Sequence, residues 1–387
     1  MEMNKKRIKL GEIGKVISGG TPSTKNSKYW NGDIFWITPT EITALKGNKY
    51  LFNSTKKITK EGLQKSSAEL IPEYSILITT RATIGELAIN KVPVTTNQGF
   101  KSISPDSNKI DYEYLFYLLK FNKNKLMRFS NGSTFAEINK NDIFNFQLSI
   151  FNSINEQKKI AEILSTWDEA ISKQEELIKR YELRKKALMQ RLLTGKVRFK
   201  EFEGQEWKEV KIGDIGKIVT GSTPPMKDEN NFGTKYCWVT AQDFKGKYIN
   251  YSKIMLSEKG IKYCRLIPKN SILVTCIASI GLNAIAGKEL STNQQINSIV
   301  ANKNFDYELI YYVIEFNRNK IIAFAGQTAV PIISKKTFSN INLFVPTNNH
   351  EQRKIATVLT AQDRQIDILK KQKTALEQQK KGLMQKL

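Results

Sequence analysis

The 387-residue sequence has few residues of the kinds that form covalent crosslinks or metal sites: three cysteines and one histidine. Cys237, Cys264 and Cys276 are odd in number and show no paired spacing, which argues against a disulfide scaffold and for a reducing, cytoplasmic setting. His350 stands alone near an expected helix start. The sequence therefore predicts neither a disulfide-rich secreted domain nor a zinc site.

Long apolar runs are also missing. The most apolar stretch, residues 271–286, is interrupted by Thr275, Ser279, Gly281 and Asn283, and it is too short to cross a bilayer. The opening residues MEMNKKRIKLGEIG contain no apolar core of signal-peptide length. We therefore expect no membrane partner.

Motifs for catalysis are absent as well. The sequence contains no Gly-x-x-x-x-Gly-Lys-Ser/Thr loop for nucleotides and no Gly-x-Gly-x-x-Gly for dinucleotides. It also lacks the Asn/Asp-Pro-Pro-aromatic tetrapeptide with which amino-methyltransferases hold a flipped base. Pro105 and Asp106 begin a nuclease-like motif that lacks its downstream acid-x-Lys. These absences favour a binding protein with no catalytic residues and no bound cofactor or metal.

Positive charge is abundant. The net charge is +24 and the isoelectric point is near 9.7, which favours a polyanionic partner, nucleic acid before membrane. A lysine-rich composition of the whole proteome would produce part of the same charge. Two helical segments, residues 155–193 and 351–387, carry net charges of +2 and +5, which leaves +17 in the remainder of the chain. We therefore expect that remainder to bind the polyanion.

The sequence repeats itself once. Residues 9–22, KLGEIGKVISGGTP, match residues 211–224, KIGDIGKIVTGSTP, at eight of 14 positions. Later matches recur at offsets near 195, such as Thr96-Asn97-Gln98 with Thr292-Asn293-Gln294. A repeat of this length is a whole domain and not a solenoid module. One chain with two such copies imitates a two-fold dimer, which suits a target made of two half-sites.

Each copy has two parts of different pattern. Residues 1–150 and 200–346 are mixed α/β, with buried strands expected at 75–79 and 271–275 and helices expected at 111–125 and 306–320, each capped by an aspartate. Residues 151–199 and 347–387 are long helices. The fold class we predict is α+β: two mixed domains separated by two helices, related by a pseudo-two-fold repeat.

The two helices show a heptad pattern of apolar residues over more than four heptads. Such a narrow stripe implies a partner helix, and a pseudo-two-fold makes the two helices of this chain an antiparallel intramolecular coiled coil about 60 Å long. The alternative is that each helix lies on its own domain or pairs with another chain. Ser153 is the expected N-cap of the first helix and Gly195 its C-cap. The apolar seam residues are Ile160, Leu164, Trp167, Ile171, Ile178, Tyr181, Leu188, Leu192, Ile355, Leu359, Ile366, Leu369, Leu376 and Leu383, with Gln174, Lys185, Gln362, Lys373 and Lys380 at polar seam positions.

Polar loops that recur in both copies are the candidate DNA-contacting segments, because backbone N–H groups, hydroxyls and lysines bind phosphates. Arg81 is the strongest single candidate, since arginine binds guanine bidentately, and the second copy has Ile277 there. For each loop a plain turn or a salt-bridged arginine is the alternative. The candidates are Gly20, Thr21, Ser23, Thr80, Arg81, Thr83, Gln98, Ser133, Lys140, Ser222, Thr223, Thr275, Ser279, Gln294, Gln295, Gln327, Lys335 and Lys336.

Two further pairs have a structural interpretation. Asn97 and Asn293 could read adenine, but identical amides in both copies favour a role in bridging backbone groups. Trp36 and Trp238 are expected in the core and not in base stacking.

In its order of parts and in several strings, the chain resembles the specificity subunit of type I DNA restriction-modification systems. The strings are Gly-Gly-Thr-Pro-Ser at 19–23, ITTRATIG at 78–85, TNQGF at 96–100, EQKKIA at 156–161 and LLTGKVRF at 192–199. The resemblance implies two target recognition domains that each read half of a split DNA site, and paired helices that set the gap. It also implies partners: two modification subunits that carry S-adenosylmethionine and methylate adenine, and motor-nuclease subunits that use ATP and Mg²⁺.

Two other functions remain open on the residues alone. A stand-alone structural DNA-binding protein would share the charge and the coiled coil but would bind DNA without a companion protein. A stand-alone nuclease or methyltransferase with an unrecognised site would bind a cofactor or modify DNA as the purified chain.

Overall fold

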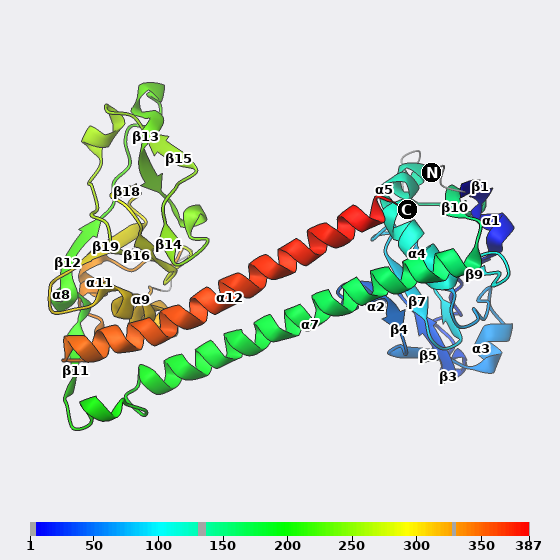
Figure 1. Cartoon of the computed structure of the whole chain (residues 1–387), viewed down its shortest axis with the longest axis horizontal. Coiled ribbons are helices and arrows are strands. Elements are labelled where there is room, and N and C mark those ends of the chain that lie inside the picture. Colours follow the sequence, from blue (N-terminus) through cyan, green and yellow to red (C-terminus); the bar gives the residue numbers. More distant parts are fainter. Residues whose placement is uncertain (1–4, 131–136, 327–329, 387) are drawn as a thin grey trace. The chain divides into compact units, whose positions relative to one another are not determined.

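The computed structural model describes residues 5–130, 137–326 and 330–386. The chain divides into two compact units, unit 1 (Met1–Glu175 with Gln372–Leu387) and unit 2 (Glu176–Lys371). Two long helices, α7 (Ile154–Leu192) and α12 (Asn349–Met384), are each shared between the units (Figure 1). Each unit therefore contains one α+β domain together with a segment of each long helix.

The domain of unit 1 occupies the chain up to α7. Its elements are β1 (Lys5–Lys9), α1 (Leu10–Ile13), β2 (Gly14–Ser18), η1 (Ser27–Tyr29), β3 (Trp30–Ile37), α2 (Pro39–Ala44), β4 (Tyr50–Leu51), β5 (Lys56–Ile58), α3 (Lys60–Gln64), β6 (Ile76–Thr79), β7 (Leu87–Asn90), β8 (Val94–Thr96), β9 (Phe100–Pro105), α4 (Tyr112–Phe121), α5 (Lys123–Met127), η2 (Arg128–Ser130), α6 (Lys140–Asn145) and β10 (Gln147–Phe151).

The domain of unit 2 lies between the two long helices in sequence. Its elements are η3 (Lys200–Phe202), β11 (Trp207–Lys211), α8 (Ile212–Ile215), β12 (Gly216–Thr220), η4 (Glu229–Asn231), β13 (Phe232–Val239), η5 (Ala241–Asp243), β14 (Tyr248–Ile249), β15 (Ile254–Leu256), η6 (Gly260–Tyr263), β16 (Ile272–Thr275), β17 (Asn283–Ala286), β18 (Ser291–Thr292), β19 (Ile296–Ala301), α9 (Tyr307–Phe316), α10 (Arg318–Ala323), α11 (Lys335–Ser339) and β20 (Asn342–Pro346).

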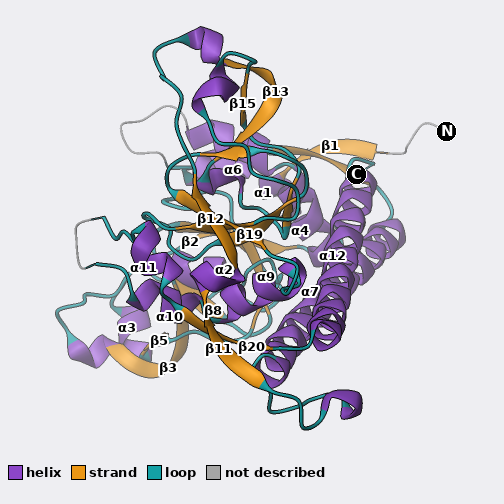
Figure 2. Cartoon of the chain, turned by 90° about the vertical axis from the view of Figure 1, so that its left-hand side faces the viewer, coloured by secondary structure: helices purple, strands orange, loops and turns teal. Residues whose placement is uncertain are grey.

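The sheets confirm the duplication strand by strand. Unit 1 has a five-stranded sheet in the order β2-β9-β6-β7-β4 and a three-stranded sheet β5-β3-β8. Unit 2 repeats both as β12-β19-β16-β17-β14 and β15-β13-β18, with β12 and β19 side by side in Figure 2. In each unit the first and last strands, β1 with β10 and β11 with β20, form an antiparallel ribbon. This ribbon joins the two ends of each domain just before its long helix begins.

The five-stranded sheet is buried on both faces. In β6, Ile76 and Ile78 belong to a core cluster with α4, whereas Leu77 belongs to a second cluster that includes Ile37 of β3 and Val94 of β8. Side chains alternate between the faces of a strand, so the sheet lies between a helical layer and the smaller sheet. The expected buried strands at 75–79 and 271–275 are confirmed as β6 and β16.

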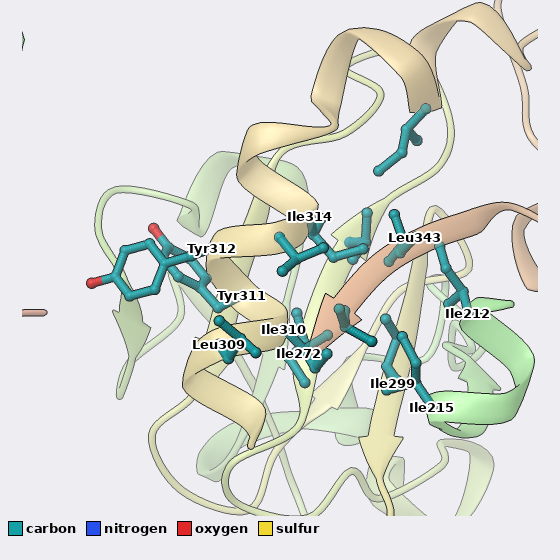
Figure 3. Packing of buried hydrophobic residues seen from close by; sticks show 14 of the residues in the cluster. Ile212, Ile215, Ile272, Ile299, Leu309, Ile310, Tyr311, Tyr312, Ile314 and Leu343 are labelled. Carbon is teal, nitrogen blue, oxygen red and sulfur yellow. The ribbon is translucent and has the colours of Figure 1, made fainter. Parts of the chain in front are cut away.

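The helical side of the unit 2 core is shown in Figure 3. Ile272 of β16 and Ile310 and Ile314 of α9 are fully buried in one cluster. Each such side chain contributes roughly 1.5–3 kcal/mol relative to an exposed one. Tyr312 projects from another side of α9, away from Leu343 of β20, and its hydroxyl reaches Asp363 of α12 as described below.

The expected helices at 111–125 and 306–320 are real but each is interrupted. Asp111 caps α4 by accepting a hydrogen bond from the Tyr114 N–H at 2.9 Å, as predicted. The helix then ends at Phe121, because Asn122 leaves helical geometry (φ −89°, ψ 12°) and its Nδ2 donates to the Leu118 carbonyl at 2.8 Å. Asparagine competes with the helical backbone through its own side chain, a tendency the periodic pattern does not show.

The ends of the long helices follow the sequence signals. Ser153 Oγ accepts from the Glu156 N–H at 3.4 Å at the start of α7, and Asn348 Oδ1 accepts from the His350 N–H at 2.7 Å at the start of α12. Gly195 has φ +68°, the left-handed conformation expected of a helix C-cap glycine. Of the helices in the described part of the chain, none has the length and apolarity needed to cross a membrane.

Ion pairs establish the direction of helix pairing within each unit. In unit 1, Asp168 of α7 pairs with Lys380 of α12, and Glu175 pairs with Lys373 at 2.7 Å. The residue number rises by seven along one helix while it falls by seven along the other, so the segments are antiparallel. In unit 2 the pairs Glu182–Lys370 and Lys185–Asp363, both at 2.8 Å, show the same direction. The intramolecular antiparallel pairing is confirmed.

The expected seam is buried or half-buried at every apolar position, but its ends have a second role. Ile160 and Leu164 of α7 pack into the core of unit 1, and Leu192, Ile355 and Leu359 pack into the core of unit 2. The N-terminal turns of each long helix therefore lie on the domain that precedes that helix, as the alternative has it, whereas Leu192 at the C-terminal end of α7 packs on the domain that follows. The middle of the seam, including Ile178, Ile366 and Leu369, lies outside both core clusters and has the narrow stripe of a helix pair.

Candidate nucleic-acid interface

Three loops of unit 1 meet at one end of the five-stranded sheet. The strand pairs Ser18↔Lys101 and Thr79↔Phe100 place the ends of β2 and β6 beside the start of β9. The loops that follow β2 and β6, and the loop that precedes β9, therefore lie at the same end of the sheet. Unit 2 repeats this arrangement through Thr220↔Asn297 and Thr275↔Ile296.

Backbone hydrogen bonds tie the loops together. The Gly20 N–H donates to the Thr96 carbonyl at 2.8 Å, and the Thr80 N–H donates to the Gly99 carbonyl at 2.7 Å. The segment that begins at Glu137 joins them, because the Ile138 N–H donates to the Thr80 carbonyl at 3.3 Å. Four segments that lie far apart in the sequence thus form one surface, which we call the loop cluster of each unit.

The same side-chain bonds support the cluster in both units. Thr21 donates to the Gln98 side-chain oxygen, and Thr223 donates to that of Gln294, which holds these exposed glutamines in place. Trp36 is buried and its Nε1 donates to the Gly20 carbonyl at 2.9 Å. Trp238 makes the matching bond to Ser222. The prediction that both tryptophans lie in the core is confirmed, and they brace the glycine-containing loop from beneath.

The two asparagines of the cluster are structural, as favoured from the sequence. Asn97 Oδ1 accepts from the Gly99 N–H at 3.0 Å, and Asn293 Oδ1 accepts from the Gln295 N–H at 3.2 Å.

Most candidate contact residues remain accessible to a ligand. The exposed ones are Ser23, Arg81, Thr83, Gln98, Lys140, Ser279, Gln294, Lys335 and Lys336, and the partly exposed ones are Thr21, Ser222, Thr223 and Gln295. Ser133 and Gln327 lie outside the described residues.

Three candidates are wrong as direct contacts because they are buried. A side chain at Gly20 would approach the Ala68 nitrogen to 2.4 Å, and the Gly20 N–H and carbonyl are both already bonded. Thr80 and Thr275 are fully buried at the strand ends. The Thr275 hydroxyl accepts from the Leu282 N–H at 3.0 Å. These residues shape the loops from inside.

The loops after β6 and β16, residues 80–85 and 276–281, have an unusual backbone, and we call them the strand-exit loops. Ala82 and Ala278 have positive φ angles of 58° and 61°, and Gly85 and Gly281 follow with 81° and 77°. A left-handed alanine is uncommon and costs of order 1 kcal/mol or more. The same conformation recurs at the same loop position in both units.

Two charged residues beside Arg81 were not anticipated. Glu137 Oε2 lies 2.7 Å from Arg81 Nη2, and Glu137 Oε1 lies 3.7 Å from the Lys101 ammonium. The hydrogen bond from Arg81 holds the pKa of Glu137 below its usual value. Burial lowers the pKa of Lys101, which is only 8% exposed, and Glu137 offsets part of that shift. One sequence signal points to this cluster. At the repeat offset of 195, Glu137 aligns with Ile332, so a charged residue is replaced by isoleucine here just as Arg81 is replaced by Ile277.

Unit 2 is apolar at the same place. Ile277, the counterpart of Arg81, forms a bridge with Ile332, the counterpart of Glu137. The Ala278 N–H donates to the Pro331 carbonyl at 3.0 Å, so residues 330–333 run beside the strand-exit loop. Ile332 and Val330 are 47% and 50% exposed.

A second repeated site joins each domain to the helices, and we call it the junction. In unit 1, Glu113 of α4 accepts from Lys49 at 2.7 Å and from Ser165 of α7 at 2.8 Å. The Tyr117 hydroxyl donates to Asp168 at 2.7 Å, and Asp168 also pairs with Lys380 of α12. Burial would raise the pKa of Glu113, but its hydrogen-bond donors keep it below its usual value. Burial raises the pKa of Tyr117.

Unit 2 has the same junction with two changes, Thr360 in place of Ser165 and Glu315 in place of Lys120. The residues are Lys247, Glu308, Tyr312, Thr360, Asp363 and Lys185. Tyr312 donates to Asp363 at 2.5 Å, and Lys185 lies 2.8 Å from Asp363. Lys185 also lies 3.3 Å from Glu315, whereas the equivalent position in unit 1 is Lys120.

No cluster of three or more potential ligands among the described residues could hold a metal ion. An α+β domain with a braced loop cluster, joined to a long helix and present twice, defines the class: a duplicated recognition module.

Comparison with known proteins identifies the family. The model of the type I restriction modification DNA specificity domain matches residues 2–180 and again 204–378. The chain belongs to this family of DNA specificity subunits, the recognition components of type I restriction-modification systems and not their catalytic ones.

Relatives of similar length support the assignment. The type I restriction enzyme MjaIX specificity subunit of Methanocaldococcus jannaschii is 29% identical, over 95% of this chain and 90% of the relative. The type I S subunit of M. genitalium shares the fold with a TM-score of 0.63 at 15% identity, over 99% of this chain and 96% of that one. A chain from a structure of type I system assembly has a TM-score of 0.65 at 17% identity, with 99% and 97% covered.

Proposed function

We propose that each domain of this chain reads one half of an asymmetric, split DNA sequence, and that the chain performs no chemistry on the DNA itself. The observation that carries the proposal is the loop cluster. Its framework is repeated bond for bond, while the residues that it exposes differ between the units, as at Arg81 and Ile277. Identical frameworks with different surfaces suit two half-sites of different sequence.

The partners we propose follow from this division. Two adenine methyltransferase subunits dock on the chain and carry S-adenosylmethionine, and motor-nuclease subunits that use ATP and Mg²⁺ join through them. The assembly acts on chromosomal DNA in the cytoplasm, a setting in keeping with three free cysteines. Exposed basic residues near the loop cluster, such as Lys140 and Lys335, hold the phosphate backbone through charge.

The long helices are proposed as the spacer between half-sites. Each residue of an α-helix adds about 1.5 Å, so one heptad adds about 10 Å, close to three base pairs of B-DNA. Inserting a heptad into both helices at facing positions preserves the seam. The gap between the half-sites should then lengthen by a fixed step, while the half-site sequences stay the same. An unchanged gap would disprove the spacer role without affecting the assignment of the loops.

The experiment that tests the proposed function is co-expression of this chain with a candidate adenine methyltransferase subunit, followed by methylation-sensitive sequencing of host DNA. We expect adenine methylation at a split motif only when both proteins are present. A second culture that expresses the chain alone is the control. Tight, specific DNA binding by the purified chain, with no motif modified in company with several methyltransferase subunits, would instead support a stand-alone DNA-binding protein.

A further inference from the structure

We propose that the two strand-exit loops read different base chemistries: unit 1 reads a guanine through Arg81 held by Glu137, and unit 2 reads a thymine through the apolar surface of Ile277, Val330 and Ile332. This inference rests on the proposed function, because it names the bases that each domain selects at one position of its half-site.

In unit 1 the arginine is positioned and still accessible. Glu137 Oε2 bonds to Nη2 of Arg81 at 2.7 Å, yet nearly half of the Arg81 side chain is exposed. A guanidinium has five N–H donors, so one bond to a carboxylate leaves donors for a base edge. The side chain is also fixed in orientation, which lowers the entropy lost when it binds. Arginine donates two parallel hydrogen bonds to N7 and O6 of guanine, the commonest specific contact in the major groove.

Glu137 is itself held in place from behind. Lys101 is nearly buried, and its ammonium lies 3.7 Å from Glu137 Oε1. The carboxylate thus bridges a buried cation and an exposed one. Glu137 is a positioning residue in this arrangement, because it acts on the base through Arg81.

In unit 2 the same two positions are apolar, with Ile277 partly exposed and Ile332 exposed. Ile277 and Ile332 form a backbone bridge, and Ile332 and Val330 each expose about half of their surface. Exposed isoleucine and valine side chains beside a basic helix start, at Lys335 and Lys336, form a small apolar surface within a phosphate-binding region. The occupant that fits this surface in duplex DNA is the C5-methyl group of thymine, the one apolar group that the major groove presents.

The location of both surfaces supports contact with DNA. Each lies at the left-handed alanine of the strand-exit loop, Ala82 in unit 1 and Ala278 in unit 2. Each also adjoins the loop that carries an exposed glutamine, Gln98 or Gln294, since the Thr80 and Cys276 N–H groups donate to residues of those loops. The base-selective residue is therefore surrounded by polar residues suited to the flanking bases and phosphates.

The test for unit 1 uses the complex with its methyltransferase subunits and the motif found by sequencing. Arg81→Ala should relax one base position of one half-site, with discrimination at that position falling by about fivefold to a hundredfold. Glu137→Ala should weaken the same position, and Glu137→Asp should restore part of it. Lys6→Ala, an exposed lysine on β1, is the matched control and should change no position. Unchanged preference for guanine in a folded Arg81→Ala complex would overturn this half of the proposal.

The test for unit 2 begins with altered DNA, so that folding of the protein is not at issue. Replacing each thymine of the second half-site by uracil removes only its methyl group. One replacement should weaken binding about fourfold, the effect of one buried methyl group. Ile332→Ser should remove that sensitivity to uracil, whereas Tyr251→Ser, which lies past the opposite sheet end, should leave it intact. Equal binding to every uracil-substituted site would overturn this half.

A double exchange links the two units. Ile277→Arg with Ile332→Glu in unit 2 should convert the thymine position toward guanine and leave the other half-site unchanged. A change in the other half-site would contradict the assignment. Failure of the proposed function looks different, since no split motif would be methylated by the unaltered complex at all.

Discussion

The junctions of the two units hold nearly the same residues, whereas their strand-exit loops do not. Glu113 and Glu308, and Tyr117 and Tyr312, make equivalent bonds to the long helices. At the loop cluster, a charged Arg81–Glu137 pair faces solvent in unit 1 where unit 2 has isoleucines. The comparison separates the parts of each unit that fix the helices from the parts that differ between the two units.

The junctions differ in one charge, and that difference has energetic consequences. Lys185 of unit 2 has two acidic neighbours, Asp363 and Glu315. Lys380 of unit 1 is paired with Asp168, and Lys120 replaces the second acid. A buried lysine that loses its partner is strongly destabilising. We therefore expect the same substitution at equivalent positions of the two junctions to change the free energy of unfolding by different amounts.

Removing the shared aspartate should have the largest effect. Asp168→Ala should lower the free energy of unfolding by about 3 kcal/mol, because it leaves the nearly buried Lys380 beside Lys120. Asp363→Ala should cost about half as much, since Glu315 remains beside Lys185. Urea unfolding measures both. Glu169→Ala, an exposed neighbour on α7, should change stability by less than about 0.5 kcal/mol. Equal losses at the two aspartates would contradict the asymmetry.

Removing the shared hydroxyl should have equal effects. Tyr117→Phe and Tyr312→Phe each delete one hydrogen bond to a carboxylate and leave the ring in place. We expect a loss of about 1.5 kcal/mol in each case. Thermal unfolding of the two variants tests this, and a loss confined to one unit would show that the junctions are not equivalent.

Exchanging the charges at the equivalent positions 120 and 315 should alter the free energy of unfolding by about 1 kcal/mol in opposite directions. Lys120→Glu should stabilise unit 1 by giving Lys380 a second acid, and Glu315→Lys should destabilise unit 2. Denaturant titration at neutral pH measures both signs. If both exchanges destabilise, packing and not charge distinguishes these positions.

The pH dependence of stability should also differ between the two junctions, because Lys380 and Lys185 have pKa values shifted in opposite directions. Burial lowers the pKa of Lys380 below 10.5, so the folded state binds this proton more weakly than the unfolded chain does. Its contribution to stability therefore grows as pH rises through the folded pKa toward 10.5. Burial would lower the pKa of Lys185 too, but Glu315 and Asp363 raise it above 10.5. That contribution is complete below 10.5 and is lost at higher pH. NMR titration of the two ammonium groups checks the order of their pKa values.

The smallest expected effect concerns phosphate contacts. Lys140→Ala in unit 1 should weaken DNA binding by the complex about threefold and reduce the salt dependence by about one counterion. Replacing both Lys335 and Lys336 of unit 2 by alanine should reduce the salt dependence by about two counterions. Binding measured at several salt concentrations gives these slopes, with Lys6→Ala as the control. A change in base preference instead would mean that these lysines contact bases.

Local sequence signals were enough to predict most of the architecture. The duplication, the buried strands, the aspartate caps and Gly195 depend on neighbouring residues and their periodicity. The heptad pattern likewise predicted the helix pairing, which the ion pairs confirm within each unit.

Contacts between distant segments could not be predicted in this way. Thr80 and Thr275 were expected at the surface, but a shift of one residue at a strand end exchanges buried and exposed positions. The partner of Arg81 is 56 residues away in the sequence, with β7, β8, β9, α4 and α5 between them. Lys380 was recognised as a polar seam position, yet its partner depends on the register of two helices and on Tyr117 from a third.

The central claim is that each domain reads its own half-site, and a domain exchange tests it most directly. Residues 1–150 would be replaced by the corresponding domain of a family member with a known motif, and the exchanged chain expressed with its methyltransferase subunit. Methylation-sensitive sequencing should then show one new half-site, with the other half-site and the gap unchanged. A motif in which both half-sites change, or neither does, would contradict the account.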